Sequence, residues 1–135
     1  MAKIKTKKGS KRSKHKLMIK KLDNLWSKVV RERDNYTCQH CGRHHKQVQA
    51  AHIFSRNNKS TRWDPDNGVT LCYYCHIQWA HREPVEFTKW VINRLGEKKF
   101  NELERKANEI VRNIDYEAIE EKLKKLLEKY KRRNE

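Results

Sequence analysis

The sequence lacks any apolar run that approaches the length of a membrane-spanning helix, which argues against an integral membrane protein. The N-terminus is basic but lacks the apolar segment of a secretory signal, so we expect an intracellular protein. Hydrophobic residues make up only 36% of the 135 residues, which is few for a well-filled core of this length. Something other than apolar burial should therefore help to hold the fold together.

Acidic residues are few beside basic ones. Lys and Arg number 33 against 17 Asp and Glu, so the formal net charge is +16. This charge predicts a polyanionic partner, with nucleic acid favoured over an anionic membrane surface. Residues 1–21 hold ten Lys or Arg and no acid, and Gly9 and Ser10 interrupt any pattern. We expect residues 1–21 to form a flexible basic tail that contacts DNA; a merely solubilising tail is the alternative.

The four cysteines fall into two matched pairs. Cys38 and Cys41 form one Cys-x2-Cys unit, and Cys72 and Cys75 form another, with thirty residues between the two units. Each unit places two thiolates on one side of a tight turn, and two such units together give the four-sulfur set that structural Zn²⁺ prefers. In a reducing compartment the spacing favours zinc over disulfides or free thiols. Zinc binding would supply folding energy that a thin core lacks.

The order of expected elements predicts an α+β, mainly helical fold. Apolar residues at helical spacing predict a helix that begins at an Asp23 cap, and Pro84, Gly96 and Asp115 mark the boundaries of later helices. The apolar stripe after Gly96 continues to Ile114. Between the helices we expect strands over 47–53 and 69–71, a polar loop over 55–68 and a helix over 72–82. The predicted divisions are the tail at 1–21, a zinc-stabilised core at 22–83 and a helical extension at 84–135.

Three polar residues lie between or beside the cysteine pairs. His52 ends the first expected strand, Asn67 precedes the second, and His76 directly follows Cys75. With a cysteine pair on each side, this order resembles the HNH (ββα-metal, treble-clef-like) endonucleases over about residues 26–81. The segment from Ala51 to Cys75 is most similar to small phage nucleases and, more loosely, to the phage recombination nucleases of the NinG (Rap) type that act on branched DNA.

Hydrolysis of a phosphodiester needs a base for the attacking water and positive charge on the phosphate. A neutral imidazole is a suitable base near pH 7, and His52 at a strand end can be aimed rigidly. The resemblance implies that His52 is the general base, that His76 binds a catalytic Mg²⁺ or Mn²⁺, and that Asn67 braces the loop. Arg56 and Arg62 flank the loop and are candidates for phosphate binding or for ordinary solvated charge.

One position departs from the family pattern. Many family members have Asp or His immediately before the base and use it as a metal ligand, whereas this chain has Ala51. His81 could join the metal set, although five residues after His76 is about one and a half turns of α-helix. Asp64 and Asp66 are alternative ligands, and a turn-forming role beside Pro65 is the simpler interpretation for both.

The sequence therefore predicts a metal-dependent endonuclease that acts on double-stranded or branched DNA and has no membrane partner. If the chain is phage-encoded, we expect it in the cytoplasm of a bacterial host. A junction-resolving role would favour a homodimer, because two strands must be cut. The main alternative is a non-catalytic zinc module that binds nucleic acid, with Ala51 as the mark of a lost site. A third interpretation is an interaction protein whose helical extension recruits a partner.

Overall fold

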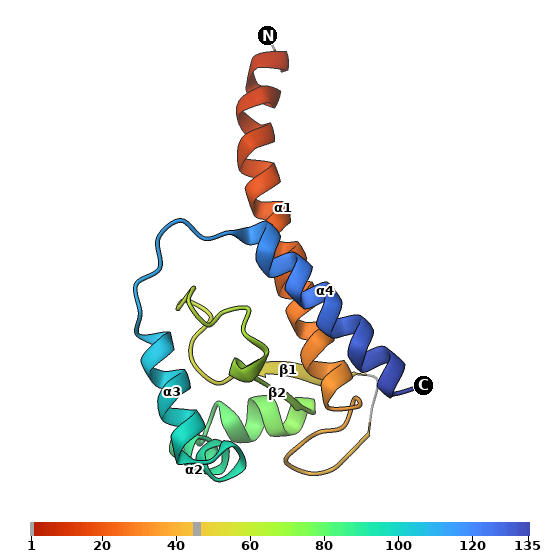
Figure 1. Ribbon diagram of the computed structural model, residues 1–135, viewed down its shortest axis with the longest axis vertical. Coiled ribbons are helices and arrows are strands. Elements are labelled where there is room, and N and C mark those ends of the chain that lie inside the picture. Colours follow the sequence, from red (N-terminus) through yellow and green to blue (C-terminus); the bar gives the residue numbers. More distant parts are fainter. Residues whose placement is uncertain (1, 45–46) are drawn as a thin grey trace.

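The computed structural model describes residues 2–44 and 47–135, and it has a mixed α+β fold that is mostly helical (Figure 1). Its only sheet within these residues is a hairpin of two antiparallel strands. The elements in chain order are α1 (Ala2–Arg33), β1 (Gln49–His52), η1 (Pro65–Asn67), β2 (Gly68–Leu71), η2 (Tyr74–Ala80), α2 (Pro84–Leu95), α3 (Glu97–Ala107) and α4 (Tyr116–Arg133). This order supports the expected fold class.

The residues expected to form a separate basic tail belong to helix α1 instead, while their flexibility and DNA contact stay predictions. The helix begins at Ala2 and continues without a break to Arg33, so neither Gly9 and Ser10 nor the proposed cap at Asp23 marks a boundary. Lys and Arg are good helix formers, and a single glycine costs only about 1 kcal/mol. The first half of α1 projects away from the rest of the molecule (Figure 1). The predicted boundary at residue 21 therefore falls inside one helix.

Helix α4 packs beside the second half of α1, and the two run in the same direction (Figure 1). Near the start of α4, Glu120 forms an ion pair with Lys21. At its end, the Arg133 guanidinium donates to the backbone carbonyl of Arg33 at 2.7 Å. A buried cluster fills this interface and reaches the loop that precedes η1: Leu22, Trp26, Val29, Val30, Trp63 and Leu123.

A second buried cluster lies on the other side of the hairpin. Val69 and Leu71 of β2 and Ala51 of β1 pack there against η2 and α2, next to Cys38 and the other buried cysteines. The strands pair with Ala51 opposite Val69 and His52 opposite Gly68. Because side chains alternate along a strand, Ala50 and His52 face α1 while Ala51 faces the second cluster. The short hairpin thus separates two small cores.

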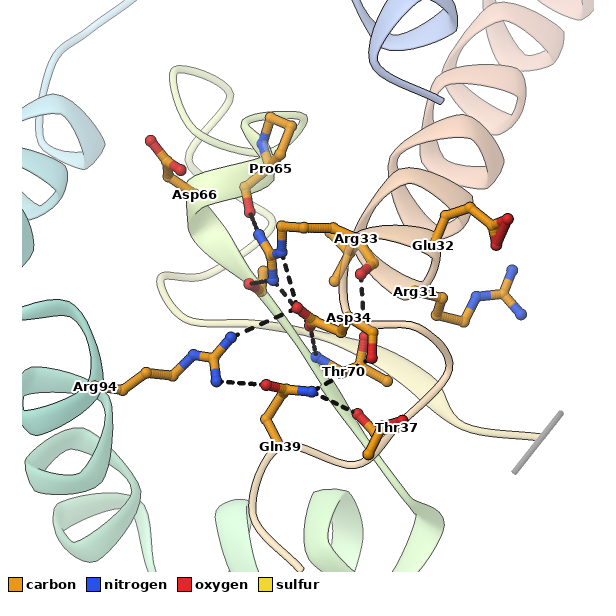
Figure 2. A network of polar contacts seen from close by, with 12 residues as sticks. Arg31, Glu32, Arg33, Asp34, Thr37, Gln39, Pro65, Asp66, Thr70 and Arg94 are labelled. Atoms are coloured by element: carbon orange, nitrogen blue, oxygen red, sulfur yellow. Dashed lines mark hydrogen bonds and ion pairs between the residues drawn. The ribbon is translucent and has the colours of Figure 1, made fainter. Parts of the chain in front are cut away.

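A buried carboxylate joins three of these elements (Figure 2). Asp34, 8% exposed at the end of α1, accepts two hydrogen bonds from Arg33 and one from the backbone NH of Thr70 in β2. Arg94 of α2 lies 3.5 Å from the same carboxylate and donates to Gln39 at 2.7 Å. A buried charge is tolerated when its hydrogen bonds are satisfied, so this network fixes α1 and α2 against the sheet.

The C-terminal helices agree only in part with the expected boundaries. Pro84 starts α2, Gly96 ends it with φ of +87°, and the Asp115 carboxylate caps α4 by accepting from the NH of Ala118. The apolar stripe expected to continue to Ile114 is interrupted, because α3 ends at Ala107. Ile110 belongs to this expected stripe but is 88% exposed, so the helical spacing wrongly indicated a buried face there. No helix in the described part of the chain is long and apolar enough to cross a membrane.

Candidate functional site

The four cysteines converge as their spacing predicted. The first Cys-x2-Cys unit comes from the turn after α1, and in the second Cys72 directly follows β2 while Cys75 lies in the first turn of η2. The four Sγ atoms lie within 4.8 Å of one another. The Cys41 and Cys72 sulfurs are 3.8 Å apart. A tetrahedral Zn²⁺ with Zn–S bonds of about 2.3 Å requires sulfurs about 3.8 Å apart. The cluster could therefore hold a zinc ion.

The electrostatics of the cluster also suit a cation. Burial by itself would raise the pKa of Cys38, but hydrogen bonds from the backbone NH groups of Cys41, Cys72 and His40 outweigh it and lower this pKa to about 7. Burial and the neighbouring sulfurs raise the pKa of Cys75. One thiolate forms readily, and further thiolates beside it need a compensating positive charge. A divalent metal ion supplies such a charge.

His40 supports this cluster and was not expected to do so. Its ring stacks on Trp79 with centroids 3.5 Å apart, and its Nδ1 lies 3.3 Å from the Cys75 sulfur. An imidazole NH directed at a ligand sulfur is the kind of outer contact that orients metal ligands. The sequence offers no pattern that singles out His40. Only the stacking partner, distant in sequence, distinguishes it from His44.

His52 is held in one orientation by two contacts. Its ring stacks on the Trp26 indole of α1, with centroids 3.8 Å apart and planes 8° apart. Its Nε2 lies 2.9 Å from the backbone carbonyl oxygen of Arg62. A carbonyl can only accept, so Nε2 carries the proton and Nδ1 is the basic nitrogen of the neutral ring. Burial lowers the pKa of His52, which favours this neutral form.

Asn67 holds the loop between the strands. The side chain is fully buried; its Oδ1 accepts from the backbone NH of Phe54 at 2.7 Å, and its Nδ2 donates to the carbonyls of Phe54 and Thr61. These bonds join the chain directly after His52 to the segment that ends at Arg62. The His52 ring is bonded to the same segment, so the geometry has the bracing form that the sequence predicted for Asn67.

The helix that carries His76 is not the expected α-helix, and the difference changes where His81 lies. Element η2 is a π-helix, and the NH of His81 bonds the carbonyl of His76 five residues earlier. In an i to i+5 pattern, residues five apart are stacked one turn above the other. The two imidazole rings lie with centroids 4.6 Å apart. The expected misalignment of His81 is therefore wrong, because it assumed the turn of an α-helix.

His76 also has a defined tautomer. Its Nδ1 lies 2.6 Å from Oε1 of Gln49 in β1, so Nδ1 donates and Nε2 is the unprotonated nitrogen. Burial is the largest of the effects that lower the pKa of His76, followed by repulsion from His81 and His52. An unprotonated Nε2 is the atom through which a neutral imidazole binds a metal ion. Gln49 was not singled out in the sequence, which offers no pattern that marks it.

These histidines face one cavity of about 440 Å³. The cavity lies between α1, β1 and η2, on the face of the hairpin to which His52 points. Its lining residues are Asp23, Trp26, Ser27, Ala50, His52, Arg56, His76 and His81. Ala51 packs into the second buried cluster. Among the described residues, the four cysteines alone form a group of three or more metal-binding side chains with adjacent ligand atoms.

Asp23 organises the basic residues at the edge of this cavity. Its carboxylate accepts two hydrogen bonds from Arg62, at 3.0 and 2.8 Å, and one from the Trp63 indole at 2.9 Å. Arg56 reaches the same carboxylate at 3.3 Å and is 61% exposed. Arg62, with a side chain only 13% exposed, is committed to Asp23, whereas Arg56 presents most of its surface to solvent.

The alternative ligands Asp64 and Asp66 have turn and ion-pair roles. The Asp64 carboxylate caps η1 by accepting from the NH of Asp66 and also accepts from Lys106 at 2.6 Å. Asp66 lies 3.5 Å from Lys99. Neither residue lines the histidine cavity. Trp26 and Asp23 do line it. The sequence marked them only for the packing and the cap of a helix, because helical spacing does not distinguish a buried face from a cavity wall.

The whole chain, residues 1–135, matches the sequence profile of the family described as Bacteriophage Lambda NinG protein. No curated protein and no solved structure matches the chain significantly. The matched span includes α1, the cysteine cluster, the histidine cavity and α4. The protein therefore belongs to the bacteriophage lambda NinG family.

Proposed function

We propose that this protein is a metal-dependent DNA endonuclease in which His52 is the general base. The observation that carries the proposal is the convergence, on one cavity, of a basic Nδ1 on His52 and an unprotonated Nε2 on His76. The formal charge of +16 supports a phosphate-containing substrate. Membership of a phage family is compatible with a role in DNA recombination or processing.

In the proposed reaction, Nδ1 of His52 takes a proton from a water molecule as the oxygen attacks phosphorus. The P–O3′ bond breaks, and the departing oxygen takes a proton from solvent. Stacking on Trp26 and the bond to the Arg62 carbonyl hold the base in place, so little reorganisation is needed at the moment of transfer. The bonds of Asn67 hold the loop that supplies this carbonyl. Arg56, the more exposed arginine, is positioned to contact substrate phosphate.

His76 and His81 would hold the catalytic ion, with water completing its coordination. A bound divalent ion supplies positive charge to the scissile phosphate and the leaving oxygen. Mg²⁺ and Mn²⁺ are the expected ions because both bind phosphate oxygens readily. The π-helix brings the two imidazoles onto one face, which offers a replacement for the ligand that Ala51 cannot provide. The zinc ion of the cysteine cluster would be structural.

The test is a cleavage assay on supercoiled, linear and four-way-junction DNA. Protein purified with its zinc is freed of other metals, and Mg²⁺ or Mn²⁺ is then added. We expect metal-dependent cutting by the wild type, its loss in His52→Ala, and normal cutting by His44→Ala, which removes an exposed histidine outside the cavity. The preferred DNA form would identify the substrate class.

A non-catalytic nucleic-acid-binding module is the second candidate. The observation that favours it is the pair of histidines, which is a small ligand set beside the usual three-ligand or carboxylate-containing metal sites. This function predicts tight, salt-dependent DNA binding and no cutting with any divalent ion. Absence of cleavage by folded, zinc-loaded wild type on all three DNA forms would reject the endonuclease and leave this alternative.

A further inference from the structure

Helix α1 presents a line of residues that leads into the histidine cavity. Residues three or four apart share one face of a helix, and Arg12, Lys16, Lys20, Asp23 and Ser27 follow one another at intervals of four, four, three and four. Asp23 and Ser27 line the cavity. Arg12, Lys16 and Lys20 are exposed. The three basic residues therefore lie on the extension of the cavity wall along the helix.

The opposite side of α1 is occupied by α4. Leu22 and Val29 are buried in the interface with that helix, and Lys21 forms an ion pair with Glu120. His15 makes an edge contact with the ring of Tyr116. These contacts fix the rotation of α1 about its axis. The row of Arg12, Lys16 and Lys20 is thereby kept on the side of the cavity and away from α4.

The length of the row can be compared with DNA. Eleven residues of α-helix separate Arg12 from Asp23, which is about 17 Å at a rise of 1.5 Å per residue. A duplex advances about 3.4 Å per base pair, so the stretch from the cavity wall at Asp23 to the far end of the row at Arg12 corresponds to about five base pairs. No acidic residue occurs among residues 1–21 to oppose the phosphates. The charge, direction and length of the row suit one flank of a DNA duplex.

We propose that Arg12, Lys16 and Lys20 form a phosphate track that holds about five base pairs of duplex on one side of the cavity. The proposal rests on the proposed endonuclease function, which makes the cavity the site of cutting. The partner bound along α1 is double-stranded DNA, held through its phosphate backbone. The track defines one flank of the substrate. Arg56, at the cavity edge, continues the line of positive charge toward His52.

A pair of triple variants tests the track. The first replaces the row with glutamine: Arg12→Gln, Lys16→Gln and Lys20→Gln. The control removes equal charge from exposed positions on other faces of the same helix: Lys11→Gln, Lys14→Gln and Lys28→Gln. Both are made in a His52→Ala background, so that binding is measured without cutting, and circular dichroism checks that α1 remains helical.

The first measurement is the affinity for a 20-base-pair duplex as a function of salt concentration. Each phosphate contact contributes about 0.9 to the slope of log affinity against log salt. We expect the row variant to lose about 2 to 3 units of slope and at least tenfold in affinity at 0.1 M salt. The control should lose less than 1 unit. Equal losses in the two variants would show diffuse charge attraction and overturn the track.

The second measurement uses duplexes shortened in steps from 20 to 6 base pairs. Wild-type affinity should level off at a duplex about five base pairs longer than the length at which the row variant levels off. An identical length dependence would overturn the track, as would tighter binding of single-stranded DNA or RNA than of duplex. Cleavage assays test the endonuclease separately. If the row variant loses affinity but the wild type cuts no DNA, the track is kept and the endonuclease is rejected. If the wild type cuts DNA but the row variant keeps its affinity, the endonuclease is kept and the track is rejected.

Discussion

At the scale of single residues, the position of His52 depends on how closely α1 and β2 approach. Gly68 is paired with His52 across the hairpin, and a Cβ at position 68 would lie 2.6 Å from the Trp26 indole and 2.7 Å from Val30. Real Cβ atoms do not approach so closely. The same indole stacks on His52 and donates to the Asp64 carbonyl at 2.8 Å. The absence of a side chain at Gly68 therefore lets Trp26 reach His52.

Replacing Gly68 with alanine should displace Trp26. Overpacking of this kind costs about 1 to 3 kcal/mol in the free energy of unfolding, which urea titration measures. We expect cleavage to fall as well, because the displaced indole no longer supports His52. Gly96→Ala is the matched control: its φ of +87° strains any other residue by a similar amount, but the site is open and far from the cavity in sequence. Equal loss of activity in both variants would contradict the role of the stack.

The pH dependence of cleavage follows from the environment of His52. A base acts when unprotonated, and burial lowers the pKa of His52 below its usual 6.5. The cleavage rate should therefore rise with pH along an acidic limb centred below pH 6.5. Single-turnover rates at saturating Mn²⁺ measure this. An acidic limb centred above pH 6.5 would mean that another group is the base.

The convergence of the four cysteines could be predicted from the sequence, because their matched spacing is typical of a zinc site. The roles of His52, Asn67 and His76 were implied by the family resemblance and stay predictions. Trp26 and Asp23 could not be recognised, since their contacts with His52 and Arg62 join segments about 26 and 39 residues apart. Helical spacing marks such residues only as buried or exposed.

At the scale of elements, η2 decides which residues share the cavity. An α-helix would place His81 away from His76, whereas the π pattern brings the two rings into edge contact, with centroids 4.6 Å apart. In an α-helix, the residue four positions after His76 would share its face, and that residue, Ala80, is buried here. The sequence carries no known signal for a π turn, so this part of the site could not be predicted. The continuous α1 and the early end of α3 were missed for a related reason: tertiary contacts and propensity outweighed the local boundary signals.

The π turn gives His81 a measurable role. We expect His81→Ala to weaken Mn²⁺ activation of cleavage by roughly tenfold or more, because one of two protein ligands is lost. Arg82→Ala, at the next exposed position, should leave the metal dependence unchanged. Cleavage rates across a Mn²⁺ titration provide the measurement. Unchanged activation in His81→Ala would leave His76 as the single protein ligand.

At the scale of the whole molecule, two small cores meet at a thin hairpin, and each has a different source of stability. The cluster around α1 and α4 is held by apolar packing around Leu123. The cluster around β2 contains three buried cysteines, and the Asp34 network in Figure 2 connects it to α1 and α2. The low hydrophobic content, 36% of the chain, predicts that burial alone is insufficient.

Removal of the metal should affect these two cores unequally. We expect chelation, or Cys75→Ser, to disorder the hairpin side first, because metal binding there is linked directly to folding. The α1 and α4 pair should retain helicity longer. Far-ultraviolet circular dichroism and hydrogen exchange, with and without added Zn²⁺, distinguish the two regions. Loss of both in a single transition would show that the cores fold as one unit.

The parallel pairing of α1 with α4 has a consequence for synthesis of the chain. The contact from Arg133 to Arg33 joins residues 100 positions apart, and α4 is made after every other described element. At about 5 to 20 residues per second, the ribosome needs roughly 5 to 20 seconds to complete that interval. During this time the apolar side of α1 is without its partner while its basic side is already complete.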